Sequence, residues 1–238
     1  MQGNAMVFNI RFRSYSVLAT LGLALAFSTG LGSSVLTNSA RAELELSVYS
    51  GVNTSPHSKV DYDFNLGAGP QSVTVGWDGE PFKMPPYFGL RATWWFDSYP
   101  AWGIALDNSH SKVAASPMPA GFNKLEFTDG INIYTANLMY RFQNESRYTP
   151  YLGIGVGFTT PHVEVTNTAG TVNTAEYQFG GPAALALVGV SAKVDDHWSV
   201  FTEFKSAYVK IEGDLNTGGY VKTDIISNQF ILGVSYKF

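Results

Sequence analysis

One pattern runs from residue 43 to the end of the chain: short segments in which apolar residues alternate with small or polar residues. In the segment 150–159, for example, Leu152, Ile154 and Val156 alternate with glycines. Successive side chains of a strand point to opposite faces, so each segment predicts a strand with one apolar face. Such strands are predicted over residues 43–51, 87–96, 102–108, 131–142, 150–159, 181–193, 198–208 and 225–238.

The residues on the other parity indicate what kind of barrel these strands form. They are glycine, serine, threonine and charged residues, whereas the interior of a soluble barrel would be bulky and apolar. Charged residues make up only 14% of the chain, against about 25% in ordinary soluble domains. This composition is typical of strands whose apolar face meets lipid. The absence of cysteine excludes disulfides and zinc–thiolate sites, and the net charge of −4 argues against nucleic acid as a partner.

The connections between the predicted strands alternate in length. The short ones are 97–100, 143–148 and 195–197, and the long ones are 51–86, 109–130, 160–178 and 209–223. Outer-membrane barrels have short periplasmic turns and long extracellular loops, and every short connection falls on one side here. The chain also ends on the aromatic Phe238, which resembles the C-terminal signature that the outer-membrane insertion machinery recognises in barrels. The sequence therefore predicts an all-β fold: a monomeric eight-stranded antiparallel up-and-down transmembrane β-barrel in the lipid of the bacterial outer membrane.

Residues 1–42 are typical of a signal peptide. Arg11 and Arg13 precede an apolar run over 17–27 that is too short to span a bilayer as a helix. Small and polar residues follow, and Ala40-Arg41-Ala42 resembles a cleavage site. The predicted organisation is a signal peptide over residues 1–42 and an outer-membrane barrel over 43–238; an uncleaved anchor is the alternative.

The inward parity carries charges of both signs near the middle of the predicted strands: Glu45, Arg91, Asp107, Glu203 and Lys205. Buried charges need partners, so we expect Arg91 to pair with at least one of Glu45, Asp107 or Glu203. Such a network would plug the barrel. A proton relay or ion path through the barrel is the alternative reading of the same residues.

Three of the four histidines map to the extracellular side: His57, His110 and His162. The accompanying carboxylates are Asp61, Asp63, Asp107, Glu126, Asp129, Glu164 and Glu176. Imidazoles with carboxylates are common ligands for Zn, Fe, Ni or Cu and also suit acid–base catalysis. Their spacing matches no compact metal motif, and the chain has no GxSxG elbow, Walker loop or HExxH motif.

Several segments together resemble one known family, the rhizobial lipid A oxidases and their alphaproteobacterial relatives. The resembling segments are 43–51, 55–58, 76–77, 84–94, 125–130, 148–151, 161–165 and 176–178. The resemblance implies oxidation of the proximal glucosamine of lipid A to 2-aminogluconate, with dioxygen as co-substrate and hydrogen peroxide as co-product.

Oxidation by dioxygen usually needs a metal or an organic cofactor, and no flavin or nicotinamide fingerprint is present. A divalent metal at the external mouth is therefore expected. By position in the resembling segments, the candidate catalytic residues are His57, His162, Glu164 and Glu126, and the first three are the candidate metal ligands. In a regular strand His162 would point outward, so a bulge or the break at Pro161 would have to turn it inward.

The alternative function is that of a non-enzymatic OmpA-type barrel with a structural or surface-interaction role. The long predicted loops would then meet ligands outside the cell. A narrow pore is disfavoured because the interior is charged.

Overall fold

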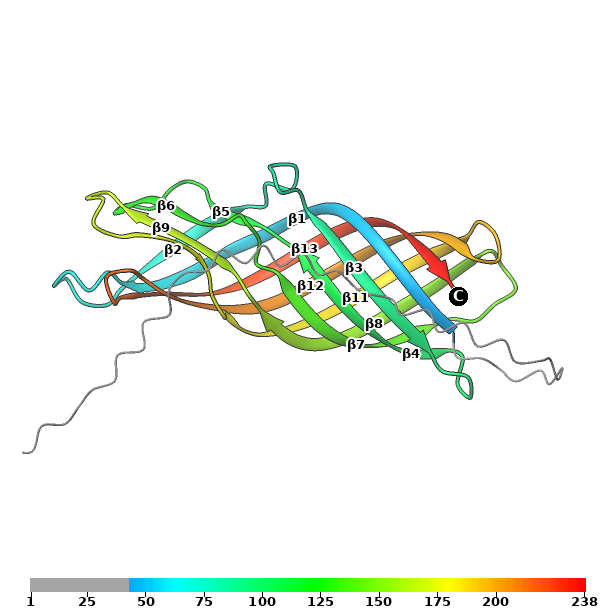
Figure 1. Cartoon of the computed structure of the whole chain (residues 1–238). Coiled ribbons are helices and arrows are strands. Elements are labelled where there is room, and N and C mark those ends of the chain that lie inside the picture. The colour runs from blue at the N-terminus through cyan, green and yellow to red at the C-terminus, as the bar shows by residue number, and fades with distance from the viewer. Residues whose placement is uncertain (1–42) are drawn as a thin grey trace, which may run out of the picture. The chain divides into compact units, whose positions relative to one another are not determined.

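The computed structural model describes residues 43–238, which form thirteen strands in one antiparallel sheet (Figure 1). β1 pairs with β13 on one side and β3 on the other, and this closes eight strands into a barrel, as predicted. The barrel strands are β1 (Glu43–Asp63), β3 (Phe88–Trp95), β4 (Trp102–His110), β7 (Ile133–Arg141), β8 (Tyr148–Thr159), β11 (Gly181–Lys193), β12 (Trp198–Asp214) and β13 (Tyr220–Lys237). Within the described residues, no helix is long and apolar enough to cross a membrane. The predicted signal peptide lies outside them.

The two ends of the barrel differ in their connections. Residues 96–101, 142–147 and 194–197 form short turns at the end where Glu45 of β1 pairs with Lys237 of β13. Short turns are periplasmic in barrels of this kind, so this end faces the periplasm. The longer connections lie at the opposite, outer end.

The prediction of long loops is wrong, because the segments concerned are in large part strands. β1, β12 and β13 continue well beyond the predicted strands. Five further strands lie between them: β2 (Gln71–Asp78), β5 (Val113–Ala115), β6 (Phe122–Phe127), β9 (His162–Asn167) and β10 (Asn173–Tyr177). They extend the sheet in the order β1-β2-β5-β6-β9-β10. We call these five strands, with residues 55–63, 209–214 and 220–225, the outer tier, and the remainder of the barrel the membrane tier.

The apolar parity reverses where the two tiers meet. On β12, Tyr208 is exposed on the outer surface while Val209 and Ile211 are buried inside. On β13 the change falls between the buried Ile225 and the exposed Ile226. Apolar side chains face outward where lipid surrounds the barrel and inward where water does. The reversal therefore marks the outer edge of the lipid-facing band. Beyond it, strands no longer show an outward apolar face, which is why the sequence pattern did not predict the outer tier.

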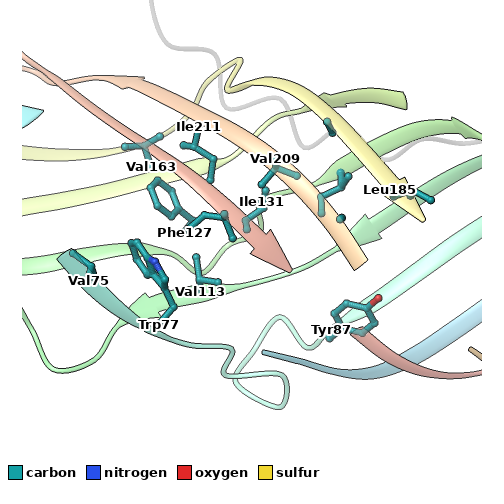
Figure 2. Close-up of a cluster of buried hydrophobic side chains, with 14 of the residues drawn as sticks. Val75, Trp77, Tyr87, Val113, Phe127, Ile131, Val163, Leu185, Val209 and Ile211 are labelled. Atoms are coloured by element: carbon teal, nitrogen blue, oxygen red, sulfur yellow. The ribbon is translucent and has the colours of Figure 1, made fainter. Parts of the chain in front are cut away.

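The outer tier encloses an apolar core. Figure 2 shows Val75 and Trp77 of β2 with Val113 of β5, Phe127 of β6 and Val163 of β9 in one cluster, and all are buried. Each such side chain contributes about 1.5–3 kcal/mol by leaving water. The tier therefore has a hydrophobic core of its own above the membrane.

The seam between β10 and β12 lacks a backbone ladder. Gln178 spans part of it, because its side chain accepts from the Asp214 amide at 2.7 Å and donates to the Asp214 carbonyl at 2.9 Å. The Asn216 amide also donates to Thr174 Oγ1 at 3.0 Å. Side-chain hydrogen bonds thus connect the two edges of the seam where backbone pairing is absent.

The membrane tier instead encloses an ion-pair network. Arg91 Nε lies 2.6 Å from Asp107 Oδ2, and Arg91 Nη1 lies 2.7 Å from Glu203 Oε2. Lys205 Nζ contacts Asp107 Oδ1 at 2.8 Å and Tyr49 Oη at 2.8 Å. The predicted pairing of Arg91 is confirmed, and two cations balance two carboxylates.

The interior of the barrel is filled by the network, by further buried polar groups and by the apolar core. A cavity of about 370 Å³ enters from the periplasmic end, and Arg91 is among its lining residues. The fully buried Lys205 pairs in register with Gln229, which is hydrogen-bonded to Tyr87 and Ser227, and the core of the outer tier follows. A filled interior favours the interpretation of the charges as a plug.

Candidate metal centre

The candidate site is built on two neighbouring strands of the outer tier, β6 and β9. Their register places Glu126 directly opposite Glu164. Leu125 and Val163 point into the apolar core, so the alternate residues of both strands point away from the barrel. Lys124, Glu126, His162 and Glu164 therefore share the outer surface of this sheet.

Lys124 holds the two facing carboxylates together. Its Nζ lies 2.8 Å from Glu126 Oε1 and also contacts Glu164 Oε2. Like charges directly opposite each other would otherwise destabilise the strand pair. Burial alone would raise the pKa of Glu126, but hydrogen bonds from Lys124 and Thr128 outweigh it and leave that pKa below its usual value. Burial likewise disfavours charge on Lys124, yet the two carboxylates raise its pKa.

A second set of groups surrounds His162. Its Nδ1 lies 3.1 Å from Glu164 Oε1 and 3.6 Å from Asp129 Oδ2. One ligand atom from each of the three residues lies within 4.8 Å of the other two. The Tyr177 ring packs against the imidazole with centroids 4.6 Å apart, and its hydroxyl donates to the Asp129 carbonyl at 2.7 Å.

This donor set fits a divalent metal ion. Ligand atoms about 2 Å from one ion are separated by roughly 3–4 Å, which the observed spacing approaches. One imidazole nitrogen with two carboxylates suits the borderline divalent metals. Lys124 occupies Glu164 Oε2, which leaves Glu164 Oε1 on the side of His162. Asp129 is 46% exposed at its side chain and His162 only 12%, so the cluster is open to the outside chiefly at Asp129.

The cluster lies just beyond an aromatic belt on the outer wall. Phe158 of β8 stacks on Tyr134 at 5.3 Å and on Phe179 at 5.8 Å, and all three are exposed on the lipid-facing surface. His162 follows Phe158 by four residues, at the start of β9. Belts of this kind mark the membrane–water interface. The site therefore lies at the height of lipid headgroups and faces away from the barrel axis.

The structure brings together only some of the predicted site residues. His162 and Glu164 are in contact, and Glu126 joins them through Lys124. His57 is exposed on β1 with its Nε2 beside Gly76 of β2, and among the described residues no ion pair or candidate metal group links it to the others. The catalytic and ligand roles of these four residues stay predictions.

The four candidate side chains were expected to meet at the external mouth of the barrel, but the structure does not bring all four together there. His162 keeps the outward register of a regular strand, because Val163 occupies the inward position. The sequence did not single out Lys124, and it placed Asp129 only among the carboxylates that accompany the histidines, not among the expected ligands. Lys124 shares a face with Glu126 at a spacing of two residues, which was a usable signal. The approach of Asp129 to His162 depends on the fold of the connection after β6 and has no such signal.

Comparisons with known proteins agree with this architecture. A family model described as "Outer membrane protein beta-barrel domain" matches residues 23–238. The outer membrane protein PagN of Salmonella typhimurium is 29% identical over 189 residues, which cover 70% of this chain and 71% of PagN. The crystal structure of OprG from Pseudomonas aeruginosa is similar with a TM-score of 0.56 and 17% identity, over 83% of this chain and 96% of OprG.

Neisserial surface protein A is similar at a TM-score of 0.47 and 17% identity, over 83% of this chain and 97% of that protein. The protein is located in the outer membrane, in agreement with its lipid-facing band of apolar side chains. On the family model and the closed barrel together, the chain belongs to the outer membrane protein β-barrel domain family.

Proposed function

We propose that this outer-membrane barrel oxidises lipid A, using dioxygen and a divalent metal held by Asp129, His162 and Glu164. One observation carries the proposal: a His–carboxylate cluster faces outward immediately above the aromatic belt. The sugar headgroup of lipid A lies at that height, outside the barrel and not within it. The outward register of His162 therefore favours a lipid substrate, although it disagrees with a site inside the mouth.

The proposed reaction removes two electrons and two protons from C1 and its hydroxyl in the proximal glucosamine. Dioxygen accepts both electrons and both protons and becomes hydrogen peroxide. The sugar becomes a lactone, and water opens the lactone to 2-aminogluconate. The reaction requires a free hydroxyl at C1, so lipid A that carries a phosphate there should not react.

Each residue of the cluster has a separate place in this proposal. His162, Glu164 and Asp129 would hold the metal, which would supply the electron transfer to dioxygen that side chains lack. Lys124 fixes Glu164 through one carboxylate oxygen and leaves the other free. Glu126 acts on Lys124 and is a positioning residue, while His57 has no part because it lies elsewhere.

A non-catalytic surface-interaction barrel is the second candidate. The observation that favours it is the outer tier itself, a sheet with its own apolar core that presents a continuous folded surface outside the membrane. Such a surface needs neither a metal nor a substrate. The two candidates make opposite predictions for purified protein.

The deciding experiment incubates purified barrel aerobically with lipid A that has a free C1 hydroxyl. Chelator-treated protein and protein reloaded with Fe, Mn or Cu are compared by mass spectrometry, with peroxide measured alongside, and Zn, which has no redox chemistry, is the negative control. We expect gain of one oxygen atom and an equal amount of peroxide, abolished by chelation and by His162→Ala. Glu212→Gln, an exposed change elsewhere on the outer tier, is the matched control. Absence of product with every metal would leave the surface-interaction barrel as the function.

A further inference from the structure

The connection between β2 and β3, residues 79–86, exposes two large apolar side chains. Phe82 is 79% exposed and Met84 is 78% exposed, the highest values for large apolar residues among those described. Figure 1 shows this connection as a narrow loop that projects away from the wall near β5 and the middle of β1. Exposed apolar side chains at the tip of a projecting loop indicate a contact surface.

The loop is held firmly where it leaves the barrel. The Tyr87 amide donates to the Pro81 carbonyl at 2.8 Å, and the buried Tyr87 hydroxyl donates to Gln229 Oε1 at 2.6 Å. Lys112 Nζ donates to the Lys83 carbonyl at 2.7 Å. Three of the eight residues are proline, which restricts the backbone further. The loop is therefore preformed, with Phe82 and Met84 held away from the protein.

The height of the loop follows from its contacts with β1. Gly79 packs against the backbone carbonyl of Asn53, and Ser50 Oγ donates to the Tyr87 carbonyl at 2.8 Å. This stretch of β1 contains Val52, an exposed member of the lipid-facing band, and Val52 pairs with the exposed Phe230. The loop thus leaves the wall at the outer edge of that band, just before the apolar parity of β1 reverses.

We propose that residues 79–86 form an arm that lies in the outer leaflet of the membrane, with Phe82 and Met84 among the lipid chains. Val52 and Phe230, exposed members of the lipid-facing band, lie on the stretch of wall from which the arm leaves. Lys83 pairs with Glu80 at 2.9 Å and lies between the two apolar residues in the sequence, and the proposal places its charge among the lipid headgroups. The occupant of this surface is lipid, and the proposal does not depend on the oxidation of lipid A.

The absence of cysteine from the chain makes a direct test possible. Phe82→Cys and Met84→Cys are labelled with a polarity-sensitive fluorophore and reconstituted in phosphatidylcholine vesicles. Leu106→Cys, at a position on the protein surface in the lipid-facing band, serves as the reference for a label inside the bilayer. Leu66→Cys, an exposed apolar position beyond the end of β1, serves as the water reference. An aqueous quencher and a spin-labelled lipid then report the depth of each label.

We expect the labels at residues 82 and 84 to be quenched by spin-labelled lipid and shielded from the aqueous quencher several-fold relative to residue 66. Quenching equal to that at residue 66 would overturn the proposal. So would shielding that disappears when protein is diluted to one barrel per vesicle, because a second copy would then be the occupant. Lys112→Met removes the hydrogen bond to the Lys83 carbonyl. The barrel should stay folded, but the label at residue 82 should lose part of its shielding from the aqueous quencher relative to the label at residue 66.

Discussion

The two tiers of this barrel solve the same packing problem in opposite ways. The membrane tier is apolar outside and holds paired charges inside, whereas the outer tier is polar outside and apolar inside. β1, β12 and β13 pass through both tiers. The comparison shows that the surrounding solvent decides whether the outward-facing residues of a strand are apolar. The alternate residues then face the interior and have the opposite character.

The interiors should therefore fail differently when a single residue is changed. In the membrane tier, removing one charge leaves its partners buried and unpaired, which costs more than the packing lost. In the outer tier, removing apolar volume leaves a cavity among side chains that can partly relax. Four predictions, from the largest expected effect to the smallest, test this difference.

Arg91→Met should lower the free energy of unfolding by about 3–5 kcal/mol, because Glu203 loses its two hydrogen bonds from Arg91 and both carboxylates are left with Lys205 alone. Urea unfolding in vesicles measures the change, and heat-modifiable migration on gels reports the folded barrel. Arg91→Met combined with Glu203→Gln should recover much of the loss, since the stranded carboxylate is then neutral. A double variant no more stable than the single one would contradict the network.

Leu125→Ala should cost roughly 2–5 kcal/mol, since Leu125 is fully buried in the core of the outer tier. We expect the damage to stay above the membrane. Limited proteolysis should cut residues 113–127 faster, while the heat-modifiable migration of the barrel stays unchanged. If protease resistance of residues 113–127 and heat-modifiable migration were lost together, the two tiers would unfold as one unit, against this prediction.

One substitution placed on the outside of each tier isolates the effect of solvent. Ile154→Arg puts a charge near the middle of the lipid-facing stretch of β8 and should cost about 2–4 kcal/mol at this depth. Asn173→Arg puts the same charge on the exposed surface of β10 and should change the stability by less than about 0.5 kcal/mol. Unfolding free energies of the two variants are measured in the same vesicles. Equal losses would contradict the assignment of one surface to lipid and the other to water.

The smallest effect concerns pH at the outer surface. The pKa of Glu126 is below its usual value in the folded protein, so its ionised form stabilises the fold at neutral pH. That stabilisation is present above the unfolded pKa near 4.5 and is lost as pH falls through the lower folded value. We expect less than about 1 kcal/mol, because Lys124 is 43% exposed. Proteolysis of the outer tier between neutral and acidic pH should show it, and Glu126→Gln should remove it.

Much of the membrane tier could be predicted from residue order alone. A strand that separates lipid from a polar interior shows period-two alternation over its full length, as residues 150–159 do. The same parity placed Arg91, Asp107 and Glu203 inside together, and their charges then required pairing. Local pattern and solvent together were sufficient for these features.

The outer tier and the candidate site depended on tertiary structure. Short strands of the outer tier, such as β5 and β10, have too few residues to show a period of their own. The contact of Glu126 with Glu164 through Lys124 needs the register of β6 against β9, two strands separated by the whole of β7 and β8. His57 is kept from that cluster by its place on β1 beside β2. Residue order therefore determined the barrel and its solvent, whereas pairing between distant strands decided which outer side chains meet.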